Sequence, residues 1–188
     1  MTYSGFEEVM ESMGNPAELV CDFVNTYDVE SGADTLTSPA TLAAWLGRHD
    51  LIGPEDTAGN DHLALAVDLR EALRVALRHN HDHEPGPPHP FAGLSLRVIL
   101  TADGPALEPV AAGVTGGLAR IAAAVMGAQA DGMWPRLKVC TESTCQWAFV
   151  DSSKNRSRSW CSMRVCGNRT KTRAYRARRQ TETGSRHL

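Results

Sequence analysis

The sequence predicts an α+β protein in two parts: a mainly helical N-terminal domain with one β-hairpin over residues 1–134, and a smaller module with a basic C-terminal helix over residues 135–188. Three observations predict this class. Apolar residues recur at helical spacing in four segments before residue 130. Two short segments near residue 100 alternate in the manner of strands. Four of the five cysteines stand in two close pairs near the C-terminus.

The first two expected helices carry start signals. One, over residues 15–27, opens with Asn-Pro, and the other, over residues 38–48, opens with Ser-Pro. Asn and Ser side chains cap the first N–H groups of a helix, and proline is tolerated in the first turn because its missing N–H would lack a partner there anyway. Both segments then show one apolar face, so we expect each to pack on a common core.

The longest periodic segment, residues 61–80, predicts a central helix with leucines recurring on its inner face. The opposite stripe, at spacing i, i+4 and i+8, consists of Arg70, Arg74 and Arg78. We expect this stripe to be a solvated face, with pairing to acidic side chains as the alternative.

Residues 81–90 (HDHEPGPPHP) predict a loop because proline and glycine interrupt any regular pattern. After it, residues 94–100 and 106–111 predict a hairpin that turns at Asp103-Gly104-Pro105, and residues 115–129 predict an alanine-rich helix. The nearby histidines could bind a transition metal, but a proline-rich loop lacks a rigid frame, so we expect no physiological site there. They are His79, His81, His83 and His89.

Charge divides the chain sharply. The net charge of −3 conceals a segment, residues 136–188, that holds 13 of the 19 basic residues and 3 of the 22 acidic ones; its charge is +10 and that of residues 1–135 is −13. Such asymmetry is typical of a basic part that binds a polyanion.

The N-terminus lacks the basic start of a secretory signal, and no apolar run approaches the roughly 18–20 residues of a membrane span. We therefore expect a cytoplasmic protein with no membrane partner, in which thiols stay reduced.

The clustered cysteines follow the pattern Cys140-x4-Cys145-x15-Cys161-x4-Cys166. Two close pairs separated by a short loop are what a tetrahedral zinc site requires, although four ordinary buried cysteines or disulfides would be the alternative. A site closed by four thiolates leaves no position for a reacting water. The spacing thus predicts one structural zinc ion per chain and no catalytic metal, whereas Cys21 is expected to be a core-edge residue.

Local patterns around these cysteines predict a treble-clef-like finger. Residues 147–150 alternate as a strand, a turn follows at 151–155, and we expect the chain to return as a hairpin to residues 160–161. A helix is expected from Gly167 to about Gln180. The candidate nucleic-acid-binding residues of this part are Arg156, Arg158, Arg164, Arg169, Lys171, Arg173, Arg176, Arg178 and Arg179.

The expected basic helix has few apolar residues, which indicates what it does. Almost none of its residues is apolar, so packing cannot explain it, and its positive charges repel one another unless a polyanion lies alongside. The alternatives are a solvated tail, or a helix docked on the acidic residues 1–135. At its start, Asn168 could cap the helix or bond to a cysteine sulfur.

The run from Cys161 to Lys171 resembles the CGNR-type zinc finger, named for the tetrapeptide that stands here at residues 166–169. The first cysteine pair and the segments 147–151 and 155–161 match that finger as well. Upstream, residues 21–26 (CDFVNT) and 34–46 (DTLTSPATLAAWL) are similar to the ABATE domain that usually accompanies it, with Cys21 standing where leucine is expected.

The resemblance implies a stress-induced bacterial transcription regulator. It also implies that Gly167 and Asn168 are structural and that, of these residues, Arg169 is the phosphate contact. Asp22, Asn25 and Thr26 lie in the ABATE motif, which implies a small-ligand or interdomain site; the residues alone suggest only a solvated or capping role.

We interpret the chain as a DNA-binding regulator, not an enzyme, whose N-terminal domain senses a small-molecule effector or forms a homodimer. Two alternatives stay open. The first is an RNA- or ribosome-associated protein that uses the same finger; we rank DNA first, although the sequence itself does not separate the two polymers. The second is a ligand-binding or enzymatic N-terminal domain with a finger that only fastens the tail, which a polar pocket at Asp22, Asn25 and Thr26 would favour.

Overall fold

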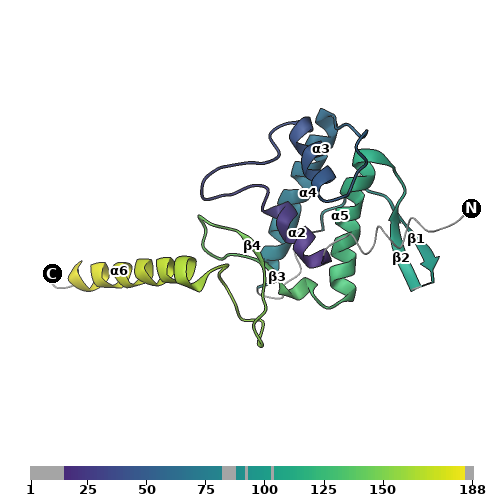
Figure 1. The fold of residues 1–188 in the computed structure, drawn as a ribbon. Helices are drawn as coiled ribbons and strands as arrows, with labels where there is room; N and C mark the ends of the chain where they lie inside the picture. The colour runs from purple at the N-terminus through teal and green to yellow at the C-terminus, as the bar shows by residue number, and fades with distance from the viewer. Residues whose placement is uncertain (1–14, 82–87, 92, 103, 185–188) are drawn as a thin grey trace, which may run out of the picture.

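The computed structural model describes residues 15–81, 88–91, 93–102 and 104–184. Within them, a helical body is formed by α2 (Pro16–Val24), α3 (Pro39–Arg48), α4 (Asn60–His79) and α5 (Gly113–Ala130) (Figure 1). The strands β1 (Leu96–Thr101) and β2 (Gly104–Pro109) form a hairpin on one side of this body. On the other side, the 3-10 turn η1 (Trp134–Arg136) leads into β3 (Leu137–Val139) and β4 (Ala148–Val150). This arrangement confirms the predicted α+β class.

The two predicted helix starts are confirmed by their caps. The Asn15 side chain accepts a hydrogen bond from the Ala17 N–H at 3.0 Å, and Ser38 forms a reciprocal capping box with Thr41. Helix α2 ends at Val24, three residues earlier than expected, because the chain turns there into an isolated antiparallel bridge between Tyr27 and Asp34.

The core runs across the boundary predicted at residue 134. It is built from leucines, Phe23 and small side chains of the four body helices. Leu137, Val139 and Ala148, which belong to β3 and β4, lie in the same cluster and are at most 2% exposed. The first strands of the cysteine module therefore complete the core of the helical body.

The β1–β2 hairpin has the register that pairs Thr101 with Gly104 and Leu96 with Pro109. Gly104 has a φ of +122°, a conformation that L-residues with side chains rarely adopt, which explains why glycine stands at the turn. Another glycine permits close packing: a Cβ on Gly117 of α5 would lie 2.7 Å from the Ile52 side chain.

The hairpin of the cysteine module differs from the prediction. Strand β4 pairs antiparallel with β3, which precedes the first cysteine pair, instead of with the returning segment at residues 156–161. Leu137 and Val139 supply apolar side chains for the core, whereas the returning segment is polar and is attached by a hydrogen bond from the Thr141 N–H to the Ser159 carbonyl, at 2.9 Å. Burial of apolar surface thus decides the pairing.

The arginine stripe of α4 is not the solvated face that we expected. Arg70 and Arg74 are only 3% and 4% exposed, and only Arg78 lies at the surface. Arg70 forms an ion pair of 2.7 Å with Asp34 and a second of 2.8 Å with Glu71. The stripe can face inward because these carboxylates and several backbone carbonyls satisfy the buried guanidinium groups.

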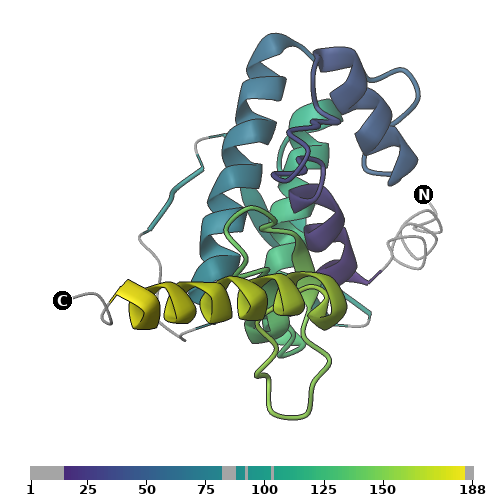
Figure 2. The same ribbon diagram turned by 90° about the vertical axis from the view of Figure 1, so that its left-hand side faces the viewer.

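The C-terminal helix stands apart from the body. After the short π-helix η2 (Met163–Gly167), α6 (Asn168–Gly184) projects outward from the body in Figure 1 and runs across the front of the view in Figure 2. Near its N-terminal end, ion pairs join Arg169 to Glu30 and Arg173 to Glu142. Its residues from 171 to 180 are all exposed. No helix in the described part of the chain combines the length and apolarity needed to cross a membrane.

Candidate metal centre and nucleic-acid interface

The four clustered cysteines converge on one point. Their sulfur atoms all lie within 4.8 Å of one another; those of Cys145 and Cys161 are 3.7 Å apart and those of Cys161 and Cys166 are 3.8 Å apart. Four thiolates at about 2.3 Å from a tetrahedral zinc ion would lie about 3.8 Å from one another, whereas a disulfide requires about 2.05 Å. The geometry fits zinc and excludes the disulfide alternative for this arrangement.

Two turns present these sulfurs. Cys140 directly follows β3, and a turn closed by the Cys145 N–H bonding to the Glu142 carbonyl at 2.9 Å presents the second sulfur. Cys166 lies within η2, whose first turn is capped by the Ser162 hydroxyl. Each pair of cysteines is therefore held by its own local turn, and the two turns meet at the metal position.

Two thiols of the cluster, those of Cys161 and Cys166, have pKa values above that of an ordinary cysteine. Burial and the neighbouring cysteines raise the pKa of Cys166 to about 12, and the same causes raise the pKa of Cys161. Because zinc binds thiolates, its uptake must release these protons, and the affinity for zinc must rise with pH. Four sulfur ligands also close the coordination shell, which makes the ion structural.

A buried ion pair lies behind the finger and was missed by sequence reasoning. Lys138 Nζ is 2.9 Å from an Asp151 carboxylate oxygen, and these side chains are 2% and 0% exposed. Asp151 also accepts hydrogen bonds from the Ser153 N–H and hydroxyl and from the Arg158 N–H. Burial alone would raise the pKa of Asp151, but these bonds and Lys138 hold it well below its ordinary value. The pair fixes the loop at 151–158 onto β3.

The predicted nucleic-acid contacts fall into three groups. Arg158 faces inward: its guanidinium lies 4.8 Å from the centre of the Phe149 ring, and its Nε donates to the Trp160 carbonyl at 2.9 Å. Arg169 is paired with Glu30 at 2.7 Å, and Arg173 with Glu142 at 3.0 Å. Arg173 remains exposed despite its ion pair, and the remaining members of the predicted set are exposed as well: Arg156, Arg164, Lys171, Arg176, Arg178 and Arg179.

Glu142 holds the first two turns of α6 in place. Its side chain is 1% exposed and accepts hydrogen bonds from Arg173, Thr170 and Thr144. Burial would raise the pKa of this carboxyl group, but these donors lower it below the ordinary value. Because Glu142 lies between the first two cysteines, it ties the direction of α6 to the metal centre. Sequence reasoning counted it only as one of three acids in a basic segment.

Asn168 takes neither role proposed from the sequence. Its side-chain N–H donates to the Arg164 carbonyl at 3.0 Å, across the junction of η2 and α6. The contact joins the turn that carries Cys166 to the start of the basic helix.

The polar residues of the ABATE motif do not form one cluster. Asn25 makes a two-point contact with the finger: its amide donates to the Ala148 carbonyl at 3.0 Å and accepts from the Ala148 N–H at 2.7 Å. The Thr26 hydroxyl donates to the Phe23 carbonyl and accepts from Arg70. Asp22 is exposed on the outer face of α2. Asn25 thus contacts the finger, and Thr26 supports the buried arginine.

The C-terminal half of α4 is the main seam between body and finger. Arg74 donates to the Val24 and Tyr27 carbonyls of the body and to the Gln146 carbonyl of the first cysteine turn, at 2.7 to 3.1 Å. Directly after the end of α4, the Asn80 side chain donates to the Leu137 carbonyl at 2.9 Å. A guanidinium that reaches both parts couples the position of the finger to that of α2.

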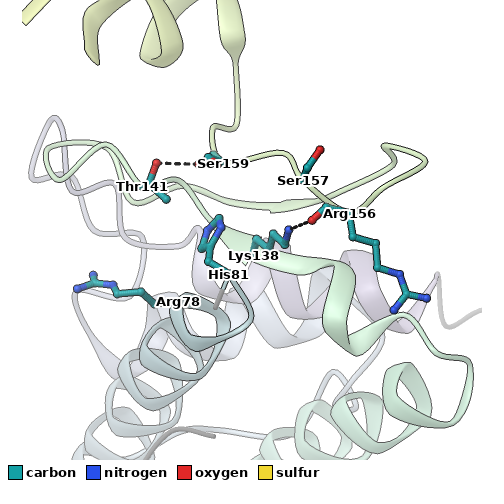
Figure 3. A pocket seen from close by; sticks show the side chains of 7 residues that line it. All are labelled: Arg78, His81, Lys138, Thr141, Arg156, Ser157 and Ser159. Carbon is teal, nitrogen blue, oxygen red and sulfur yellow. Dashed lines mark hydrogen bonds between the residues drawn. The ribbon is translucent and has the colours of Figure 1, made fainter. Parts of the chain in front are cut away.

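A pocket of about 240 Å³ opens at this seam (Figure 3). It is lined by Arg78, His81, Lys138, Thr141, Arg156, Ser157 and Ser159. Figure 3 shows the guanidinium groups of Arg78 and Arg156 pointing away from each other, and Lys138 is already paired with Asp151. Asp22, Asn25 and Thr26 are not among the lining residues, and the cationic groups of the pocket do not converge on one ligand.

Two family models match the chain in sequence order. The ABATE model, described as "Putative stress-induced transcription regulator", matches residues 17–137, and the model of the CGNR zinc finger matches residues 136–179. None of the curated proteins compared with the chain matches it. A zinc-finger family and four converging sulfurs together establish one structural zinc ion.

Proposed function

The chain belongs to the ABATE family and carries a CGNR zinc finger, and on that premise we propose that it is a DNA-binding transcription regulator that presents α6 to nucleic acid. In this proposal Cys140, Cys145, Cys161 and Cys166 are the four ligands of the zinc ion. In this proposal residues 1–134 would sense an effector or form the dimer, and residues 135–188 would contact nucleic acid.

The observation that carries the proposal is the exposure of α6. The helix contains six basic residues and one acidic residue, and it stands away from the body with residues 171–180 exposed. A helix docked internally on the acidic residues 1–135 would bury its basic face, yet the contacts to Glu30 and Glu142 involve only the first two turns. Exposed positive charge along a helix is suited to phosphates, whose neutralisation releases counterions.

The shape of α6 favours DNA over RNA. The major groove of B-DNA is wide enough to admit an α-helix, whereas the major groove of A-form RNA is deep and narrow. The contacts would come from Lys171, Arg176, Arg178 and Arg179, with Arg156 and Arg164 beside them and with Arg169 and Arg173 joining where a phosphate displaces Glu30 or Glu142. Arg158, held under the finger, would act by supporting the loop.

The helical body supplies the second part of the proposal. It would form a homodimer or respond to a small-molecule effector in the cytoplasm, and the α4 seam would transmit the response because Arg74 bonds to both body and finger. Asp22, Asn25 and Thr26 would contribute as parts of that seam and of its surface.

Crosslinking in cells, followed by sequencing of the recovered nucleic acid, tests the proposal. We expect duplex DNA fragments from intergenic regions, and we expect Cys166→Ser to abolish their recovery. Recovery of ribosomal or messenger RNA alone would support the RNA-associated alternative, and recovery of neither polymer would refute a nucleic-acid function.

A further inference from the structure

The outer edge of the β1–β2 hairpin offers an unpaired strand. The sheet contains β1 and β2 in that order, and β2 lies against α5, so that β1 is the outer strand. No described strand pairs with its other edge. An isolated two-stranded sheet is only marginally stable in water, and its free edge is a template for another strand.

The backbone groups that face outward can be assigned from the register. The Val110 N–H donates to the Ser95 carbonyl at 3.0 Å, which marks these two residues as a hydrogen-bonded pair. Pairs of this kind alternate along an antiparallel ladder. The N–H and C=O groups of Leu96, Val98 and Leu100 therefore point to the unpaired edge.

Apolar side chains accompany this edge. Val98 is 69% exposed and Leu100 is 85% exposed. The register places Leu107 opposite Val98 and Pro105 opposite Leu100, so one face of the hairpin is apolar throughout. Proteins usually protect such an edge with lysine, proline or a bulge, and β1 contains neither lysine nor proline.

Charge on the strand is already neutralised within the chain. The one charged residue of β1, Arg97, is paired with Glu108 of β2 at 2.6 Å. A neutral, apolar edge with outward backbone groups has nothing to offer a phosphate backbone. It matches another strand of the same composition.

We propose that β1 is the dimer interface: the β1 strands of two copies pair antiparallel about a twofold axis at Val98 and form a four-stranded sheet. The inference rests on the homodimer in the proposed function and identifies its surface. In this register Val98 lies opposite Val98, Leu96 opposite Leu100, and Arg97 opposite Ile99 of the second copy. No like charges meet, and each copy contributes the same self-complementary patch.

The position of the hairpin is compatible with a dimeric regulator. Figure 1 shows β1 and β2 on the side of the body opposite α6. Pairing through β1 leaves both basic helices accessible, which a protein that binds two DNA half-sites requires.

A charge-complementation experiment on the zinc-loaded full chain tests the interface. Val98→Lys and Val98→Glu each place like charges opposite one another at the twofold axis, so we expect the dimer to weaken at least about tenfold in each variant. An equimolar mixture of the two variants brings Lys opposite Glu, and we expect dimers to return. Sedimentation equilibrium distinguishes the monomer of 20.3 kDa from the dimer. Val75→Lys, on the exposed face of α4, is the matched control and should associate like the parent.

Each outcome decides the proposal. A parent protein that stays monomeric, single variants that dimerise like the parent, or a mixture that remains monomeric would each overturn it, provided that circular dichroism shows the variants folded. DNA binding, measured on the same samples, separates this result from the regulator function. A monomeric parent that binds DNA refutes only the interface, whereas a complementing dimer that does not bind DNA refutes only the function.

Discussion

Helices α4 and α6 both carry arginines at helical spacing, yet they use them in opposite ways. In α4, Arg70 and Arg74 are almost fully buried, whereas α6 exposes every residue from 171 to 180. The difference lies in the neighbours. Buried guanidinium groups require carboxylates or carbonyls at hydrogen-bonding distance. The buried arginines of α4 have Asp34, the end of α2 and Glu71 of their own helix at that distance.

Two acidic side chains bind α6 at its N-terminal end. Glu30 and Glu142 pair with Arg169 and Arg173, and both arginines belong to the first two turns. An arginine stripe in a sequence therefore does not by itself indicate a polyanion-binding surface. The stripe of α4 fastens the finger to the body, and in our proposal that of α6 contacts a partner.

The largest expected effect concerns the metal centre. Cys166→Ser removes one proposed ligand, and structural zinc sites of this kind contribute about 10–16 kcal/mol in peptides. We expect the variant to lose its zinc and residues 140–184 to lose protection from hydrogen exchange. Helices α2 to α5 should stay protected because their own core persists.

Elemental analysis and hydrogen exchange measure these two effects, with Cys21→Ala as the control. Cys21 is buried in α2, outside the cluster, and its variant should retain one zinc ion per chain. Full zinc content in Cys166→Ser would contradict the assignment.

A smaller but still large effect should separate the two arginine stripes. Arg74→Met removes the donor to the Val24 and Tyr27 carbonyls, and we expect the free energy of unfolding to fall by about 3 kcal/mol. Arg176→Met, at an exposed position of α6, should change it by no more than about 0.5 kcal/mol. Urea unfolding of both variants measures the difference, and equal losses of stability would show that α6 is also an internal clamp.

The buried ion pair should give a modest pH dependence. Because the pKa of Asp151 is lowered in the folded protein, its charged form contributes stability above its unfolded value near 3.8, and this contribution is lost as the pH falls below that value. The parent should therefore exceed Asp151→Asn in unfolding free energy at neutral pH, and the excess should shrink below about pH 4. Unfolding of parent and variant at matched pH separates this effect from zinc loss, which affects both proteins. A difference in unfolding free energy that does not change with pH would refute the predicted role of the Asp151 charge.

Local sequence signals predicted much of this fold. The caps at Asn15 and Ser38, the long α4 pattern and the cysteine spacing each depend on residues close together in the chain, and the structure confirms the resulting helices and the converging sulfurs. The predictions that were wrong concern contacts between residues that lie far apart in the sequence. The burial of Arg70 requires Asp34, which lies 36 residues away, and no local period reveals that pairing.

The same reason explains the errors in the finger. Strand β4 was predicted, but its partner β3 was not, because the choice depends on burial of Leu137 and Val139 in a core that the helices build. The Asn25 contact with Ala148 spans 123 residues, so the sequence could indicate a role for Asn25 without showing its partner. A lysine between two buried apolar residues of β3, followed by an aspartate directly after β4, was a readable signal for the Lys138–Asp151 pair.

The salt dependence of DNA binding shows whether α6 contacts phosphates. With about four to six phosphates neutralised, the parent should lose roughly two to three decades of affinity between about 50 and 200 mM salt, and each lost contact should flatten the slope by about 0.9. Lys171→Ala combined with Arg176→Ala should therefore flatten the slope by about two units while leaving zinc content and unfolding free energy unchanged. Arg48→Ala, on the exposed end of α3, should leave the slope as it is. A double variant that binds DNA with the parent's slope but unfolds more easily would contradict the account, because α6 would then be an internal clamp and not the nucleic-acid contact.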